Sequence, residues 1–126
     1  MASCGDFEGV TDVGAPRRAG SCEYDEARER YVVDGAGANI WDARDDFHFV
    51  WKRMSGDFIV TARAAFEGEG ANAHRKLGWM ARASLDPDAP HVSAVVHGDG
   101  LLALQFRRSR GGETEEVRSP LTDADV

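Results

Sequence analysis

Residues 34–51 read DGAGANIWDARDDFHFVW, and this stretch decides which fold class the sequence favours. A dinucleotide-binding turn needs three glycines that lead from a strand into a helix, because the helix N-terminus binds the phosphates. Only Gly35 and Gly37 fit that spacing, and they are followed by Trp41, an acidic turn and an alternating apolar run. The pattern therefore predicts a turn between strands, with glycines at positions of positive φ.

Period-two alternation of apolar residues recurs along the chain, and it is typical of strands, whose successive side chains point to opposite faces of a sheet. The alternating runs are residues 47–52, 58–63, 77–82 and 102–107, and further strands are expected at 9–14 and 31–35. Turn-forming residues separate the runs, and the helix-like residues 24–31 also fit a charged surface turn. The sequence predicts an all-β fold, an antiparallel two-sheet β-sandwich.

The composition indicates one globular domain over residues 1–126, with residues 1–8 flexible. A net charge of −7, from 22 acidic and 15 basic residues, argues against a nucleic-acid partner. No apolar run is long enough to predict a membrane span, and the first residues lack a signal-peptide pattern, which leaves a cytoplasmic or envelope location open. Cys4 and Cys22 are too few for a disulfide framework, and whether they pair stays open.

Catalytic and metal-binding patterns are missing from the sequence. The four histidines, His48, His74, His91 and His97, lack the spacing of a compact metal site, so no metal or other cofactor is expected. The Glu-x-Asp-x-x-Glu strand of laminarinase-type glycosidases and the Gly-x-Ser-x-Gly elbow are both absent. We therefore predict no catalytic residue.

Polar side chains alternate with large apolar ones on the predicted strands. If apolar residues such as Trp51, Trp79 and Leu104 face the core, the polar ones line the opposite face of a sheet. Guanidinium and amide groups on a curved sheet suit sugar hydroxyls, carboxylates or sulfates, although a solvated outer face explains the same pattern. The candidate ligand-binding residues on the strands are His48, Arg63, Arg82, Gln105 and Arg107.

Three motifs give the chain a family resemblance. They are Gly-x-Gly-x-x-Ile-Trp at 35–41, Ser-Gly-Asp-Phe at 55–58 and Gly-Trp-Met-x-Arg-x-Ser at 78–84. From about Gly9 onward the chain resembles concanavalin A-like lectin/glucanase jelly rolls, domains of unknown function such as those in bacterial TolB-like biopolymer-transport proteins. The resemblance implies a jelly roll with a concave polar face, and it supports Trp41, His48, Arg82, Gln105 and Arg107 as ligand-binding residues.

The resemblance also shapes what we expect of the whole protein. Relatives usually continue with further strands, so we expect a jelly roll that is incomplete at the C-terminus, and a full-length chain with possible further domains. The leading hypothesis is a non-catalytic module that binds a polar ligand, a carbohydrate, on its concave face. One alternative is a glycoside hydrolase or lyase, which would show facing carboxylates. Another is a structural or interaction domain of a TolB-like envelope protein, which would show an exposed apolar patch.

Overall fold

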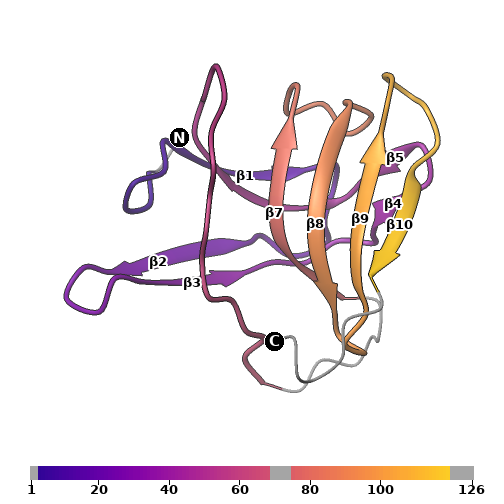
Figure 1. The fold of residues 1–126 in the computed structure, drawn as a ribbon. Helices are drawn as coiled ribbons and strands as arrows, with labels where there is room; N and C mark the ends of the chain where they lie inside the picture. The colour runs from indigo at the N-terminus through magenta and orange to yellow at the C-terminus, as the bar shows by residue number, and fades with distance from the viewer. Residues whose placement is uncertain (1–2, 69–74, 120–126) are drawn as a thin grey trace. The chain divides into compact units, whose positions relative to one another are not determined.

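The computed structural model describes residues 3–68 and 75–119, and every regular element in these ranges is a β-strand (Figure 1). All pairings between these strands are antiparallel, so the all-β antiparallel prediction is confirmed. Within the described ranges, no helix is long and apolar enough to cross a membrane.

The chain divides into two compact units. The first unit comprises Met1–Phe58 with Leu85–Asp88, and the second comprises Ile59–Ser84 with Ala89–Val126. A backbone hydrogen bond of 2.7 Å from Asp45 N to Pro87 O links the short insertion to the rest of the first unit.

Three two-stranded antiparallel sheets form the first unit. Its strands are β1 (Gly9–Val13), β2 (Ser21–Asp25), β3 (Arg30–Asp34), β4 (Ile40–Trp41), β5 (Arg44–Asp45) and β6 (Phe47–Trp51). β1 pairs with β6, β2 with β3, and β4 with β5. The β1–β6 pair includes the buried residues Val13 and Trp51, and the Trp51 indole donates a hydrogen bond of 3.0 Å to Thr11 Oγ1.

A β-hairpin forms where residues 24–31 carry a helix-like charge pattern. β2 and β3 pair with Tyr24 opposite Tyr31, and their ring centroids lie 4.4 Å apart. The turn between them includes Glu29, whose φ of 50° is positive. The charged stretch is therefore a hairpin turn.

The N-terminal segment is attached to this hairpin by a disulfide. Cys4 and Cys22 are bonded to each other, which answers the question that the sequence left open. The phenolic oxygen of Tyr31 also accepts a hydrogen bond of 2.9 Å from Asp6 N, and the Phe7 ring lies edge-on to Tyr31 at 5.3 Å. These contacts connect residues 4–7 to β2 and β3.

The stretch 34–51 forms a turn, the short strands β4 and β5, and then β6. Gly37 has a φ of 153°, and a side chain at this position would collide with the backbone carbonyl of Asp46. Only glycine tolerates so close an approach between two backbone segments. The prediction of a turn between strands is confirmed here, but the positive φ expected at both glycines is found at Gly37 and not at Gly35.

One four-stranded antiparallel sheet forms the second unit, in the order β10-β9-β8-β7. Its strands are β7 (Lys76–Arg82), β8 (His91–His97), β9 (Leu102–Arg107) and β10 (Glu115–Ser119). The alternating runs at 77–82 and 102–107 lie in β7 and β9, as predicted.

The strand expected at residues 58–63 is not formed. These residues belong to no strand, and the Ile59 side chain is 92% exposed. An isolated extended segment is not stable as a strand, because its backbone groups need a hydrogen-bonded neighbour. Among the described residues this segment has no pairing partner.

Candidate functional site

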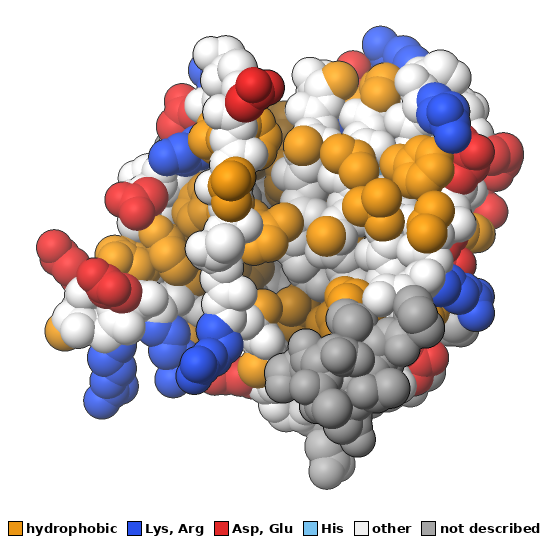
Figure 2. Space-filling model, in the orientation of Figure 1, with side chains coloured by type: hydrophobic (Ala, Val, Ile, Leu, Met, Phe, Trp, Pro, Cys, Tyr) orange, Lys and Arg blue, Asp and Glu red, His pale blue; other side chains and the backbone are white. Residues whose placement is uncertain are grey.

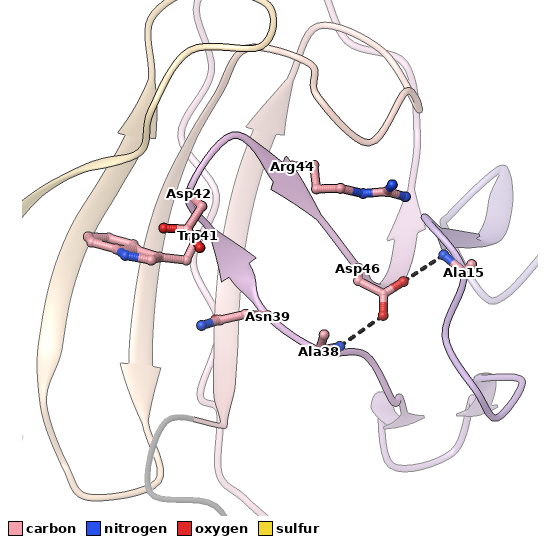
Figure 3. A pocket seen from close by; sticks show the side chains of 7 residues that line it. All are labelled: Ala15, Ala38, Asn39, Trp41, Asp42, Arg44 and Asp46. Carbon is pink, nitrogen blue, oxygen red and sulfur yellow. Dashed lines mark hydrogen bonds between the residues drawn. The ribbon is translucent and has the colours of Figure 1, made fainter.

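An open pocket of about 420 Å³ lies at the β4–β5 hairpin of the first unit (Figure 3). We call it the Trp41 pocket. It is lined by Ala15, Ala38, Asn39, Trp41, Asp42, Arg44 and Asp46. Trp41 and Arg44 are cross-strand partners in the β4–β5 register, and Figure 3 shows their side chains extending toward opposite ends of the site.

The Asp46 carboxylate connects the segments that border the pocket. Its Oδ1 accepts a hydrogen bond of 2.6 Å from Ala15 N, and its Oδ2 accepts one of 2.9 Å from Ala38 N (Figure 3). Hydrogen bonds to a charged carboxylate are stronger than those between neutral groups. Asp46 therefore fixes the shape of the pocket and holds the chain ahead of β4 in place.

The pocket combines an aromatic ring with hydrogen-bond donors and hydrogen-bond acceptors. Trp41 is half-buried, and Asn39, Asp42 and Arg44 are exposed. The Asn39 side-chain oxygen accepts a hydrogen bond of 2.8 Å from Ile40 N, which leaves its NH₂ group as a donor. The Arg44 guanidinium makes no hydrogen bond or ion pair to any described residue, so it is available to a ligand.

His48 lies in the same unit but does not line this pocket. Its side chain is 3% exposed, and its Nδ1 lies 2.9 Å from Asp12 Oδ1 on the neighbouring strand β1. A side chain at Gly20 would collide with the imidazole, and one at Gly35 would collide with the Cβ of His48. His48 is therefore enclosed within the first unit, and its buried Nε2 has no partner among the described residues.

Arg107 is buried in the second unit, with 1% of its surface exposed. Its Nε donates a hydrogen bond of 2.7 Å to Gly112 O, and its two Nη atoms donate bonds of 3.1 Å to Ala89 O and Thr114 Oγ1. These bonds tie together the chain before β8 and the chain between β9 and β10. The guanidinium therefore binds the protein's own backbone and hydroxyl groups.

Gln105 is also buried, with 2% of its surface exposed. Its Nε2 donates a hydrogen bond of 3.0 Å to Glu116 Oε1 and lies 3.4 Å from His97 Nε2. The hydrogen bond from Gln105 is the main cause that lowers the pKa of Glu116 below its ordinary value, and Arg118 adds to the effect.

The two remaining predicted residues also belong to the second unit. Arg82 is half-buried on β7, where its Nε donates a hydrogen bond of 2.9 Å to Ser84 O and its Nη1 lies 3.7 Å from Met80 Sδ. It shares a face with Met80 and points away from Trp79, as the odd spacing predicts. Arg63 is exposed in the segment that forms no strand.

The six predicted residues are thus not brought together at one site. Trp41 and His48 belong to the first unit, and the other four belong to the second. In the second unit, Gln105 and Arg107 lie two residues apart on one face of β9. Arg82 lies in the same cross-strand row as Arg107, because both pair with His91 in the sheet register.

The sheet of the second unit reverses the expected orientation of its faces. We expected Trp79 and Leu104 to face a core, yet they are 38% and 43% exposed. The opposite face, which we call the polar face, is buried; it comprises His91, Ser93, His97, Gln105 and Arg107. Hydrogen bonds within the unit offset the cost of burying Arg107, Ser93 and the Gln105 amide nitrogen, whereas Gln105 Oε1 has no partner among the described residues.

The exposed side of this sheet carries apolar residues on all four strands. We call it the apolar face; it includes Trp79, Val92, Leu104 and Val117, which are between 38% and 59% exposed. Trp79, Leu104 and Val117 lie in one cross-strand row. Figure 2 shows hydrophobic side chains gathered over β7, β8 and β9.

Neither a metal cluster nor a catalytic pair stands out. Within residues 3–68 and 75–119 no three His, Cys, Asp or Glu side chains form a group that could hold a metal ion; His74 lies outside these ranges. Two carboxylates, Asp42 and Asp46, line the Trp41 pocket, but both oxygens of Asp46 already accept backbone hydrogen bonds.

The sequence reasoning missed three polar residues of the pocket, namely Asn39, Asp42 and Arg44. The sequence did contain a signal for them, because all three lie close to Trp41 and directly follow the predicted glycine turn. A two-residue turn between two strands would also place residues 41 and 44 opposite each other.

Comparison with known proteins adds no assignment: no protein family, no curated protein and no solved structure matches this chain.

Proposed function

We propose that this protein is a non-catalytic binding module and that its ligand, a carbohydrate, occupies the Trp41 pocket. The observation that carries the proposal is the combination of an aromatic ring with amide, guanidinium and carboxylate groups around one recess. A sugar ring has an apolar face that can stack on an indole, and its hydroxyls need both donors and acceptors. Asn39, Arg44 and Asp42 supply these groups.

The polar face of the second unit is a poorer candidate for the ligand surface. Gln105 and Arg107 are almost fully buried, and their donors are engaged by Glu116 and by Gly112, Ala89 and Thr114. A ligand could reach them only by breaking these bonds, which leaves buried groups unsatisfied. We therefore assign the ligand to Trp41 and not to the row of polar strand residues.

The finer fold class is part of the same proposal. The motifs at 35–41, 55–58 and 78–84 support a concanavalin A-like jelly roll of the type found in TolB-like proteins, and the antiparallel all-β architecture is compatible with it. A shared fold would not by itself assign a ligand.

A second candidate function is that of an interaction domain, which the exposed apolar face favours. Contiguous apolar surface on a protein commonly marks a contact with another macromolecule. Replacing Leu104 with Ser should then weaken any self-association or partner binding seen by light scattering. A protein that stays monomeric over a wide concentration range and binds carbohydrate would count against this candidate.

The test of the leading proposal is a glycan array followed by calorimetry on any carbohydrate that binds. We expect Trp41→Ala to weaken binding at least about tenfold, because losing an aromatic stacking contact removes roughly 1.5 kcal/mol. Trp79→Ala is the matched control, since Trp79 is a half-exposed tryptophan outside the pocket.

Two outcomes would contradict the proposal. One is a carbohydrate affinity that Trp41→Ala leaves unchanged while Trp79→Ala lowers it. The other is the absence of binding to any glycan by a protein whose circular dichroism shows a folded all-β chain.

A further inference from the structure

Strand β7 forms an open edge of the second unit's sheet. Among the described residues it pairs only with β8. Hydrogen bonds from Ala83 N to Pro90 O at 3.1 Å and from Gly98 N to Arg75 O at 2.8 Å show that odd-numbered residues bond toward β8. Because bonding directions alternate in an antiparallel pair, Gly78 and Met80 direct their N–H and C=O groups away from β8.

A segment of the same unit has the pattern of a strand but lacks a partner. Residues 59–66 form no strand, and Figure 1 draws them as an extended trace without an arrow. Val60, Ala62, Ala64 and Phe66 alternate with Ile59, Thr61, Arg63 and Ala65. Ile59 and Val60 are 92% and 39% exposed, which is an unfavourable state for large β-branched side chains.

One contact brings the end of this segment to the start of β7. The Arg75 guanidinium lies over the Phe66 ring, 4.4 Å from its centroid. Arg75 directly precedes Lys76, the first residue of β7. Phe66 is therefore positioned where a hairpin between the segment and β7 would begin.

We propose that residues 59–66 form a strap that closes onto the open edge of β7 as a fifth, antiparallel strand. With Phe66 opposite Arg75, the register places Arg63 opposite Gly78 and Thr61 opposite Met80. In this register the backbone N–H and C=O groups of Arg63 and Thr61 can form hydrogen bonds with those groups of Gly78 and Met80 that point away from β8.

The apolar pattern selects this register over a slip by one residue. In it Val60 and Ala62 lie opposite Ala81 and Trp79 and extend the apolar face. A slip by one residue would turn them to the polar face, beside Met80, because the side-chain period of a strand is two.

The strap has a protective consequence for the sheet. An open, apolar edge strand is a template on which another chain can add a strand. Closure of residues 59–66 over β7 occupies that edge within the same chain, so release of the strap would permit pairing between two copies.

Engineered disulfide formation tests the register directly. We expect the pair Val60→Cys and Ala81→Cys to cross-link under mild oxidation at least tenfold faster than Thr61→Cys with Ala81→Cys, because Thr61 points to the opposite face. Peptide mapping by mass spectrometry separates this bond from the native Cys4–Cys22 disulfide. Equal rates for the two pairs, or cross-links only between two chains, would overturn the proposal.

Amide hydrogen exchange on the unmodified protein supplies a second measurement. The strap predicts that the amides of Thr61, Arg63 and Ala65 exchange at least tenfold more slowly than those of Val60 and Ala62, whose N–H groups point outward. Thr61→Pro removes a hydrogen-bond donor to β7, so it should abolish this protection and produce dimers in light scattering. Val60→Pro removes no such donor, so both effects should be smaller. Exchange of all five amides at the rate of an unstructured peptide would contradict closure.

Discussion

At the residue scale, Gln105 and Arg107 of β9 are buried and donate hydrogen bonds within the second unit. Period-two alternation correctly separated Gln105 and Arg107 from Leu104 and Phe106. It could not tell which face of the sheet is buried, because that depends on which side supplies hydrogen-bond partners. Gly112, Ala89 and Thr114 supply them for Arg107, and none of these positions is marked in the sequence.

Replacement of Arg107 tests its structural role. We expect Arg107→Met to lower the free energy of unfolding by about 3 kcal/mol or more, because it leaves buried acceptors without their charged donor. Urea denaturation followed by fluorescence measures the change. Arg108→Met is the control: Arg108 pairs with Glu115 at 2.7 Å, but its side chain is 73% exposed, so a loss below about 1 kcal/mol is expected. Similar losses for both variants would contradict the role assigned to Arg107.

Glu116 makes the stability of the second unit sensitive to acid. Its pKa in the folded protein is lowered below the ordinary value of 4.5 by the hydrogen bond from Gln105 and by Arg118. A lowered folded pKa stabilises the protein above the unfolded pKa, and this contribution is lost as the pH falls through the folded value.

We therefore expect Glu116→Gln to be less stable than the wild type at neutral pH, by roughly 1 to 2 kcal/mol. The difference should shrink as the pH falls below about 4.5, where the carboxyl of the unfolded chain becomes protonated, and level off below the lowered folded pKa, where the carboxyl is protonated in both states. Thermal melts between pH 7 and pH 3 measure it, with Glu115→Gln as the exposed control. A difference that stays constant across this range would show that Glu116 does not act through its charge.

At the element scale, three of the four alternating runs became strands, and the strands expected at 9–14 and 31–35 formed as β1 and β3, whereas β8 and β10 were not predicted. Residues 47–52, 77–82 and 102–107 correspond to β6, β7 and β9. β8 was missed because its sequence, HVSAVVH, mixes small, apolar and polar residues, and β10 because its charged EEVRS resembles a loop. The run at 58–63 has the alternation of a strand, but no described strand pairs with it. Alternation therefore indicates only that a segment is suited to a half-buried strand, and a strand forms only where a neighbour completes its hydrogen bonds.

The turn at Gly35 and Gly37 was predicted from the sequence, whereas the short strands β4 and β5 that follow it were not. Its glycine spacing excluded a phosphate-binding helix, and the close approach of Gly37 to the Asp46 backbone explains why glycine is needed. The strap proposal also belongs to this scale, since it concerns whether one element finds its partner in β7.

At the scale of the whole molecule, the two places where a polar ligand could bind belong to different units. The Trp41 pocket lies in the first unit and the polar face in the second. Trp41 was predicted from the family resemblance, whereas its polar neighbours were not, because their positions depend on the β4–β5 hairpin and on the bonds of Asp46. Because the two places lie in different units, the residues whose magnetic resonance signals shift when a ligand binds will show which unit holds the ligand.

The most direct test is a nuclear magnetic resonance titration of the ¹⁵N-labelled protein with a carbohydrate identified on the array. Our account predicts shifts for the Asn39 and Arg44 amides and for the Trp41 indole N–H. The Gln105 and Arg107 amides should remain unchanged. Shifts confined to residues 91–107, with the Trp41 indole unmoved, would contradict the account and return the binding site to the polar face of the second unit.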